Sequence, residues 1–186
     1  MLTGMVAKKQ RFARVLGPAV TLGIGAVLAC SVGATAATRP GLLSLDGISG
    51  ARPGMSVEQL DALWAVRLKV EDSQASPGCR TGAVRADGIA GGVMFEGSHW
   101  TAAWFTSGVR TPRGIHIGST LADLRSAYAQ LLFREHSLYV PGAWIHYVQR
   151  QRAPHWRLRF DVSPSGRVQT IWFGATPDVR AQEGCA

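Results

Sequence analysis

The chain has 186 residues, of which 46% are hydrophobic and 17% charged, with a formal net charge of +8. This length and composition fit one globular domain with its own core and exclude a disordered polar chain. Four of the positive charges lie in the first 14 residues, so the remainder is only mildly basic and its charge gives no reason to expect a nucleic-acid partner.

The first 36 residues have the pattern of an export signal. Basic residues precede an apolar run over residues 15–32, and Ala34-Thr35-Ala36 is a small-residue cleavage sequence. We therefore expect residues 1–36 to be a signal peptide. Two alternatives stay open: Val27-Leu28-Ala29-Cys30 resembles a lipoprotein box in which Cys30 would be lipidated, and the uncharged stretch is nearly long enough for an uncut membrane anchor.

A linker over residues 37–45 and a first repeat over residues 46–110 are expected next. Ser56 is a good N-cap, and the apolar spacing that follows predicts an amphipathic helix beginning at Val57. The polar segment 71–82 predicts a loop. Short strands are expected over residues 83–86, 92–95 and 100–105.

Residues 111–186 are expected to form a second repeat in the same order. Ser119 or Thr120 would cap a helix, and Ser163-Pro164-Ser165-Gly166 is a strong hairpin signal. The apolar stripe of the predicted helix is Leu121, Leu124, Tyr128, Leu131 and Leu132. Strands are expected over residues 137–140, 144–150, 156–162 and 167–173.

Two segments of the chain, residues 54–64 and 118–128, share the order glycine, hydroxyl, aliphatic, leucine and terminal aromatic. Self-similarity of this kind predicts a duplicated supersecondary unit. Alternating apolar and polar residues over 156–162 predict a sheet that is covered on one face only. The expected fold class is α+β, with two tandem helix-plus-antiparallel-meander repeats, helices on one face of the sheet, and residues 46–186 as one compact unit.

This order of motifs resembles the superfamily of the secreted β-lactamase inhibitor proteins of actinomycetes and the small outer-membrane assembly lipoproteins of Gram-negative bacteria (SmpA/OmlA-like). Residues 111–124, with Gly118-Ser119-Thr120-Leu121, are most similar to tandem-repeat exported actinobacterial proteins. The resemblance covers roughly residues 46–186. It implies a disulfide between a mid-chain cysteine and the cysteine of a C-terminal Gly-Cys pair, here Gly184-Cys185. The inhibitor proteins carry a disulfide within each repeat, so their inhibitory activity is assigned to no residue of this chain.

Cleavage after Ala36 would leave two cysteines, Cys79 and Cys185. An isolated pair outside the cytoplasm is normally oxidised, which predicts a disulfide between them. The bridge would close a loop of about 107 residues and stabilise the fold by roughly 4–5 kcal/mol in the chain-entropy model. A reactive thiol is disfavoured because neither cysteine has a CxxC partner or a basic setting.

No motif for catalysis, metal or cofactor binding emerges. The glycine-rich run over residues 88–92 leads into a strand rather than a helix, so it predicts a turn or bulge instead of a phosphate cradle. Gly-x-Ser-x-Gly is absent, and Asp87 and Glu96 fall in predicted turns. The histidines lack metal-ligand spacing: His99, His116, His136, His146 and His155.

The function expected is that of an exported, non-enzymatic protein-interaction domain, monomeric, that binds a secreted or envelope protein through its open sheet face. Contact with a membrane is expected only through the signal segment or a lipid anchor. Aromatic and arginine side chains on that face have the composition of a binding hot spot: Arg157, Arg159, Thr170, Trp172, Trp100 and Trp104. Two alternatives remain, an envelope lipoprotein with a structural role anchored at Cys30 and a secreted cell-wall hydrolase.

Overall fold

The computed structural model describes residues 41–86, 88–129, 132–150, 153–176, 178–182 and 185. The predicted signal peptide, Cys30 and residues 37–40 of the predicted linker lie outside this set. The described residues all belong to one compact unit, and all that follows concerns that unit.

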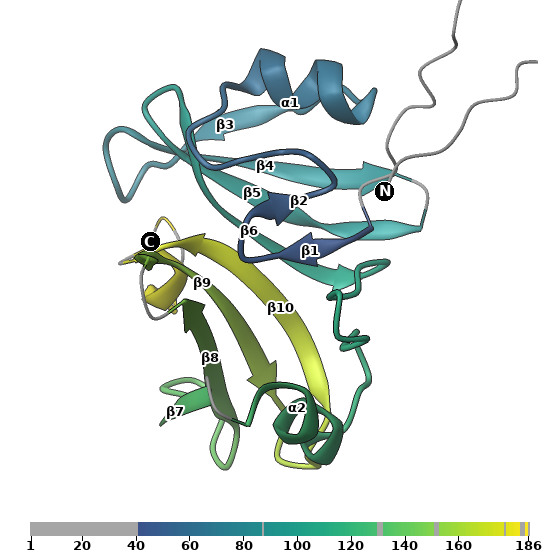
Figure 1. The fold of residues 1–186 in the computed structure, drawn as a ribbon. Coiled ribbons are helices and arrows are strands. Elements are labelled where there is room, and N and C mark those ends of the chain that lie inside the picture. The colour runs from purple at the N-terminus through teal and green to yellow at the C-terminus, as the bar shows by residue number, and fades with distance from the viewer. Residues whose placement is uncertain are drawn as a thin grey trace, which may run out of the picture. The chain divides into compact units, whose positions relative to one another are not determined.

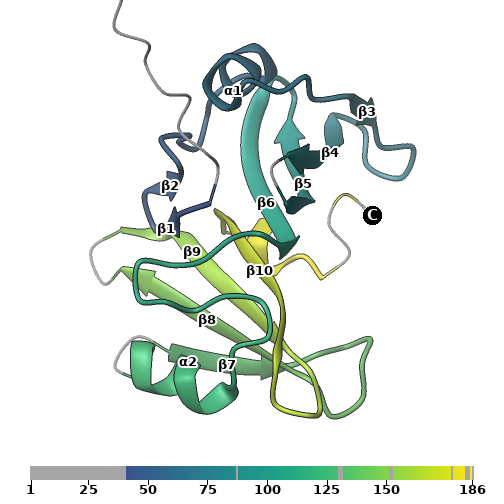
Figure 2. The ribbon, with the colours of Figure 1, turned by 90° about the vertical axis from the view of Figure 1, so that its right-hand side faces the viewer.

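Most of this unit is one antiparallel sheet of eight strands in the order β3-β4-β5-β6-β10-β9-β8-β7 (Figures 1 and 2). Strands β6 and β10, which are far apart in sequence, pair at its centre. The strands are β3 (Val70–Asp72), β4 (Cys79–Ala86), β5 (Ile89–Glu96), β6 (His99–Ser107), β7 (Leu132–His136), β8 (Trp144–Arg150), β9 (Ala153–Val162) and β10 (Val168–Ala175). The remaining elements are a two-stranded sheet of β1 (Leu43–Ser44) and β2 (Gly47–Ile48), helices α1 (Val57–Trp64) and α2 (Leu121–Tyr128), and the 3₁₀ helix η1 (Asp178–Arg180).

The expected fold class, two tandem helix-plus-meander repeats in an α+β domain, is wrong. The chain is built mainly of strands, which join into a single eight-stranded sheet through the β6–β10 pair instead of forming two units side by side. Each α-helix has only eight residues. The motif shared by residues 54–64 and 118–128 spans a turn and a short helix. It therefore contains no information on how the strands that follow pair.

Both helices begin with a reciprocal capping box. Ser56 Oγ accepts a hydrogen bond from Gln59 N, and Gln59 Oε1 accepts one from Ser56 N. Thr120 and Asp123 repeat this arrangement at α2. These contacts satisfy backbone donors that have no partner inside a helix, so the predicted start at Val57 and the Thr120 alternative are confirmed.

The main hydrophobic core lies on one side of the eight-stranded sheet, which we call the near face. Leu60 and Trp64 from α1, with Leu124 and Tyr128 from α2, pack against this face. Strands β1 and β2 add Leu43 and Ile48 to the same layer. Its sheet residues include Val93, Phe95, Phe105, Val148, Leu158, Phe160, Ile171 and Phe173.

Several expected boundaries are corrected by the structure. The predicted linker includes β1, because Leu43 is fully buried and its backbone N donates to Arg110 O at 2.9 Å. The predicted loop over 71–82 contains most of β3 and the start of β4. No strand covers residues 137–140. Strand β7 lies earlier, at Leu132–His136, so Leu132 belongs to a strand instead of the α2 stripe.

The expected alternation along β9 is confirmed, and β10 shows the same pattern. Leu158, Phe160, Ile171 and Phe173 belong to the near-face core. The residues between them point to the opposite side of the sheet, because successive side chains of a strand alternate between its two sides. We call this side the far face. The Ser163–Gly166 turn that joins these strands is closed by a hydrogen bond from Gly166 N to Ser163 O at 2.9 Å.

Candidate interaction surface

The far face, expected to be bare, is covered over β9 and β10 by the C-terminal segment, described here at residues 178–182 and 185. The exposed fractions of Arg159 and Trp172 are only 4% and 8%. The 3₁₀ helix η1 of this segment packs against β6, β9 and β10. The expectation of an open sheet face is therefore wrong at this place, because the chain folds its own end across it.

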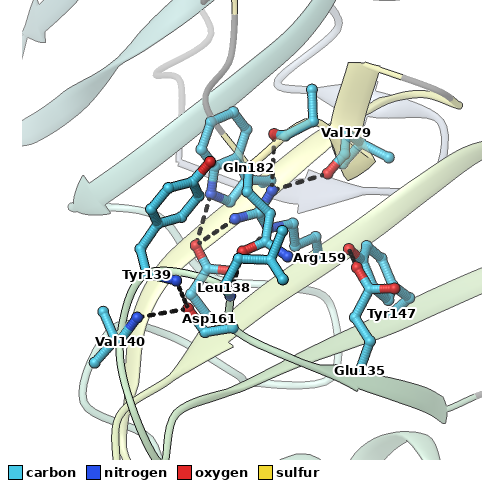
Figure 3. Close-up of polar contacts among 12 residues, drawn as sticks. Glu135, Leu138, Tyr139, Val140, Tyr147, Arg159, Asp161, Val179 and Gln182 are labelled. Carbon is cyan, nitrogen blue, oxygen red and sulfur yellow. Dashed lines mark hydrogen bonds and ion pairs between the residues drawn. The ribbon is translucent and has the colours of Figure 1, made fainter.

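Arg159 makes four hydrogen bonds, two of which hold the C-terminal segment to the sheet (Figure 3). Its Nη1 donates to Val179 O at 3.2 Å and Ala181 O at 3.1 Å, while Nε and Nη2 donate to the Asp161 carboxylate at 2.7 and 3.2 Å. Trp172 Nε1 donates to the same carboxylate at 2.9 Å, and its ring lies 4.6 Å from the Arg159 guanidinium carbon. The buried cation is thus fully paired, which is the condition for tolerating a charge in a protein interior.

Aromatic stacking continues from this cluster across the far face. The rings of Trp104 and Trp172 stack with centroids 5.2 Å apart. Trp104 lies over the backbone of Gly92, where a Cβ atom would collide with the indole ring. The absence of a side chain at Gly92 therefore allows the Trp104 ring to lie close to the backbone.

Trp100 and Trp104 point to opposite faces of the sheet, although the sequence analysis predicted that they share one face. The β5–β6 pairing matches Met94 with Ala102 but Phe95 with Trp100, so Thr101 is an extra residue in β6. A bulge of this kind reverses the alternation. Trp100 is consequently buried in the near-face core, with its Nε1 donating to Ala102 O.

The predicted disulfide between Cys79 and Cys185 is confirmed, with Cα atoms 5.7 Å apart. Cys185 packs with Met94 and Ala102 in a small far-face cluster, and its carbonyl accepts a hydrogen bond from Ser73 Oγ at 2.7 Å. The bond therefore fastens the C-terminal segment to β4, and Arg159 fastens it to β9. Such a disulfide agrees with an oxidising, extracytoplasmic environment.

A second polar cluster lies where β7, β8 and η1 meet. Tyr147 donates to Glu135 Oε1 at 2.5 Å and Arg180 donates to Glu135 Oε2 at 2.8 Å. Although burial works against it, these two hydrogen bonds hold the pKa of Glu135 below its ordinary value. Burial and the bond to Glu135 raise the pKa of Tyr147. Glu135 is thus a carboxylate held in place by neighbours.

Among the six residues predicted to bind a partner, three are buried. Arg159, Trp172 and Trp100 offer almost no surface to another protein. The other three are partly buried, and their role in binding stays a prediction: Arg157, Thr170 and Trp104. Burial, followed by the nearby charge of Arg180, lowers the pKa of Arg157, whose guanidinium carbon lies 5.0 Å from the Phe133 ring centroid.

The exposed apolar residues lie elsewhere, in the loop between β7 and β8. The exposed fractions of Leu138, Tyr139 and Val140 are 78%, 55% and 45%. With Phe133 on β7, they make up four of the five exposed large hydrophobic side chains that the described residues contain. Three consecutive apolar residues before Pro141-Gly142 do not alternate, and this signal could have identified a loop instead of a strand.

The backbone of this loop is fixed although its side chains are exposed. Ser137 Oγ accepts hydrogen bonds from Tyr139 N and Val140 N at 3.3 and 3.1 Å, and Ala143 N donates to Val140 O at 3.0 Å. Leu138 N donates to Gln182 Oε1 at 2.9 Å (Figure 3). The loop is therefore held by the C-terminal segment, while the side chains of Leu138 and Val140 stay exposed.

The described part of the chain contains no group of three or more His, Cys, Asp or Glu residues that could hold a metal ion. Within that same part, none of the helices has the length and apolar character needed to cross a membrane.

Comparison with known proteins gives no family assignment. No family model and no curated protein matches the chain. Three solved structures are similar at TM-scores of 0.46, 0.44 and 0.44. They are an extracellular protein containing an SCP domain from Bacillus anthracis (10% identity, 66% of this chain and 44% of that one), a cysteine-rich secretory protein from Staphylococcus aureus (9%, 70% and 47%) and the uncharacterized protein yfeY from Escherichia coli (13%, 65% and 89%). This chain spans less than half of the first two, and similarity at these scores carries no inference about function.

Proposed function

We propose that this chain is an exported, non-enzymatic domain that binds another extracytoplasmic protein, and that the contact is centred on Leu138, Tyr139 and Val140. The observation that carries the proposal is the high exposure of three consecutive apolar side chains on a fixed backbone. Apolar groups gathered at one place on a surface favour association, because their burial removes them from water.

The fixed backbone supports the proposal on energetic grounds. A flexible loop loses conformational entropy when it binds, whereas a loop that is already ordered loses less. The hydrogen bonds of Ser137 and Gln182 supply this order here. Gln182 belongs to the segment that the disulfide fastens, so the oxidised state of Cys185 supports the conformation of the loop. Export into an oxidising compartment fits this dependence.

Matched serine substitutions test the surface. Leu138→Ser with Val140→Ser removes two exposed side chains of the loop, and Leu42→Ser removes a side chain of 50% exposure elsewhere. Cross-linking to secreted and envelope proteins, read by mass spectrometry, should show a specific partner for the wild type and the Leu42 variant. The loop variant should lose it. Equal cross-linking of all three proteins would contradict the assignment.

The processed form of the chain is tested separately. Mass spectrometry of the mature N-terminus distinguishes cleavage after Ala36 from acylation of Cys30, which would make the protein an envelope lipoprotein. Either outcome is compatible with the loop as the contact surface, since the loop lies in the compact unit that follows both sites. If the protein keeps residues 1–36 and is found in the cytoplasm, export itself is contradicted.

A further inference from the structure

His146 is a buried histidine with no hydrogen-bond partner. Its exposed fraction is 1%, and neither ring nitrogen has a partner among the described residues. It lies on β8 between Arg134 of β7 and Phe160 of β9, with which it pairs across the sheet. A buried polar group without a partner is costly, so its ring nitrogens identify a place where a ligand would restore the missing hydrogen bonds.

The histidine lines a hollow of about 390 Å³ on the near face. The other lining residues are Arg125 and Ala129, at the C-terminal end of α2, and Phe133 and Arg134 of β7. Two arginines and a histidine therefore line the hollow, and none of the described carboxylates does. Neither Arg125 nor Arg134 makes an ion pair with a described carboxylate, although Arg134 stacks on Trp144 at 4.2 Å.

The charges around the hollow act on the histidine. Burial, followed by the positive charges of Arg125 and Arg134, lowers the pKa of His146 to about 4. The elements packed against His146 contribute Arg125 from α2, Arg134 from β7 and the apolar Phe160 from β9. A water molecule would serve one ring nitrogen of His146 alone. An anion would also accept hydrogen bonds from Arg125 and Arg134, whose side chains are exposed to solvent.

We propose that this hollow binds a small oxyanion, the phosphate or carboxylate group of a ligand, with Arg125 and Arg134 contacting its oxygens and His146 donating a hydrogen bond from one ring nitrogen. Guanidinium groups suit this role because their planar donors match two oxygens of a carboxylate or phosphate at once. The site is separate from the exposed loop over residues 138–140, and it neither requires nor excludes a protein partner.

The test follows the Cε1–H signal of His146 by NMR in a zwitterionic buffer, with inorganic phosphate or sodium acetate added. A bound anion favours the imidazolium form, so the pKa of His146 should rise by about one unit or more when the site is filled. The exposed His116 serves as the internal control and should not respond. A response of the His146 signal to phosphate alone would indicate a phosphoryl ligand, and a response to acetate alone would indicate a carboxylate ligand.

Substitutions separate a built site from general attraction to a basic surface. Arg125→Gln and Arg134→Gln should each weaken anion binding about tenfold or more, the loss of one charge-assisted hydrogen bond. Arg85→Gln, at an exposed arginine of β4, is the matched control and should bind normally. Arg125 is itself exposed, so its replacement leaves the fold intact. No response of His146 to about 10 mM of either anion, or an equal response in all three variants, would overturn the proposal.

Discussion

The two faces of the sheet are covered by different means. The near face is covered by α1, α2 and the β1–β2 pair, whose apolar side chains pack on those of the strands. Over β9 and β10, the far face is covered by a short C-terminal segment held by Arg159 and by the Cys79–Cys185 bond. Apolar packing spreads stability over many residues, whereas the far-face cover depends on a few specific contacts.

Two buried polar side chains, one on each face, differ in their hydrogen bonding. Arg159 on the far face is satisfied by a carboxylate and two backbone carbonyls. His146 on the near face has no partner among the described residues. On the proposal above, Arg159 serves the fold, while His146 is left for a ligand. Four predictions test this difference, from the largest effect to the smallest.

Loss of the disulfide should have the largest effect. Cys79→Ser with Cys185→Ser should lower the free energy of unfolding by about 4–5 kcal/mol in the chain-entropy model. Denaturant unfolding measures this, and the fluorescence of Trp172 should shift to longer wavelength as the far face opens. If the stability of the variant equals that of the oxidised wild type, the C-terminal segment is held by other contacts.

Asp161→Ala should destabilise the protein by about 3 kcal/mol, because it leaves the cation of Arg159 buried without its carboxylate. Asp72→Ala is the matched control. It removes the partner of Arg80 at 3.1 Å, but Asp72 has an 87% exposed side chain, and we expect a change below about 0.5 kcal/mol. Thermal and denaturant unfolding compare the two variants. Similar losses would show that far-face burial contributes little.

We expect His146 to make the free energy of unfolding sensitive to mild acid. Its pKa is about 4 in the folded chain and near 6.5 when unfolded, so the unfolded chain binds the extra proton first as the pH falls. Without an anion, stability should therefore decrease by about 2 kcal/mol from pH 7 to pH 5. Glu135, whose pKa is lowered, loses its contribution only at more acid pH. Unfolding measured across this range should give a shallower profile for His146→Phe than for the wild type.

Replacement of the exposed loop should leave stability almost unchanged. Leu138→Ser with Val140→Ser should change the free energy of unfolding by less than about 0.5 kcal/mol, because these side chains bury little surface within the chain. Urea unfolding checks this value. A larger loss would mean that the loop stabilises the fold itself and is not an unoccupied contact surface.

Local features of the fold followed from the sequence. Ser56 and Thr120 start helices because their side chains satisfy backbone donors a few residues away. Ser163–Gly166 closes a hairpin, and the alternation of Leu158 and Phe160 with arginines assigned both to the core. The cysteine pair could also be predicted, since only two cysteines follow the expected cleavage site. Each of these features depends on nearby residues or on a count.

The fold class and the candidate surfaces depended on contacts between distant segments. No local pattern indicates that β6 pairs with β10, that Thr101 bulges and sends Trp100 to the near face, or that Arg159 binds the carbonyls of residues 179 and 181. The sequence by itself therefore determined where the two helices begin, where one hairpin turns and which residues of β9 are apolar. Only the tertiary structure decided which face is covered, because a pairing partner or a covering segment is chosen by the free energy of the whole chain.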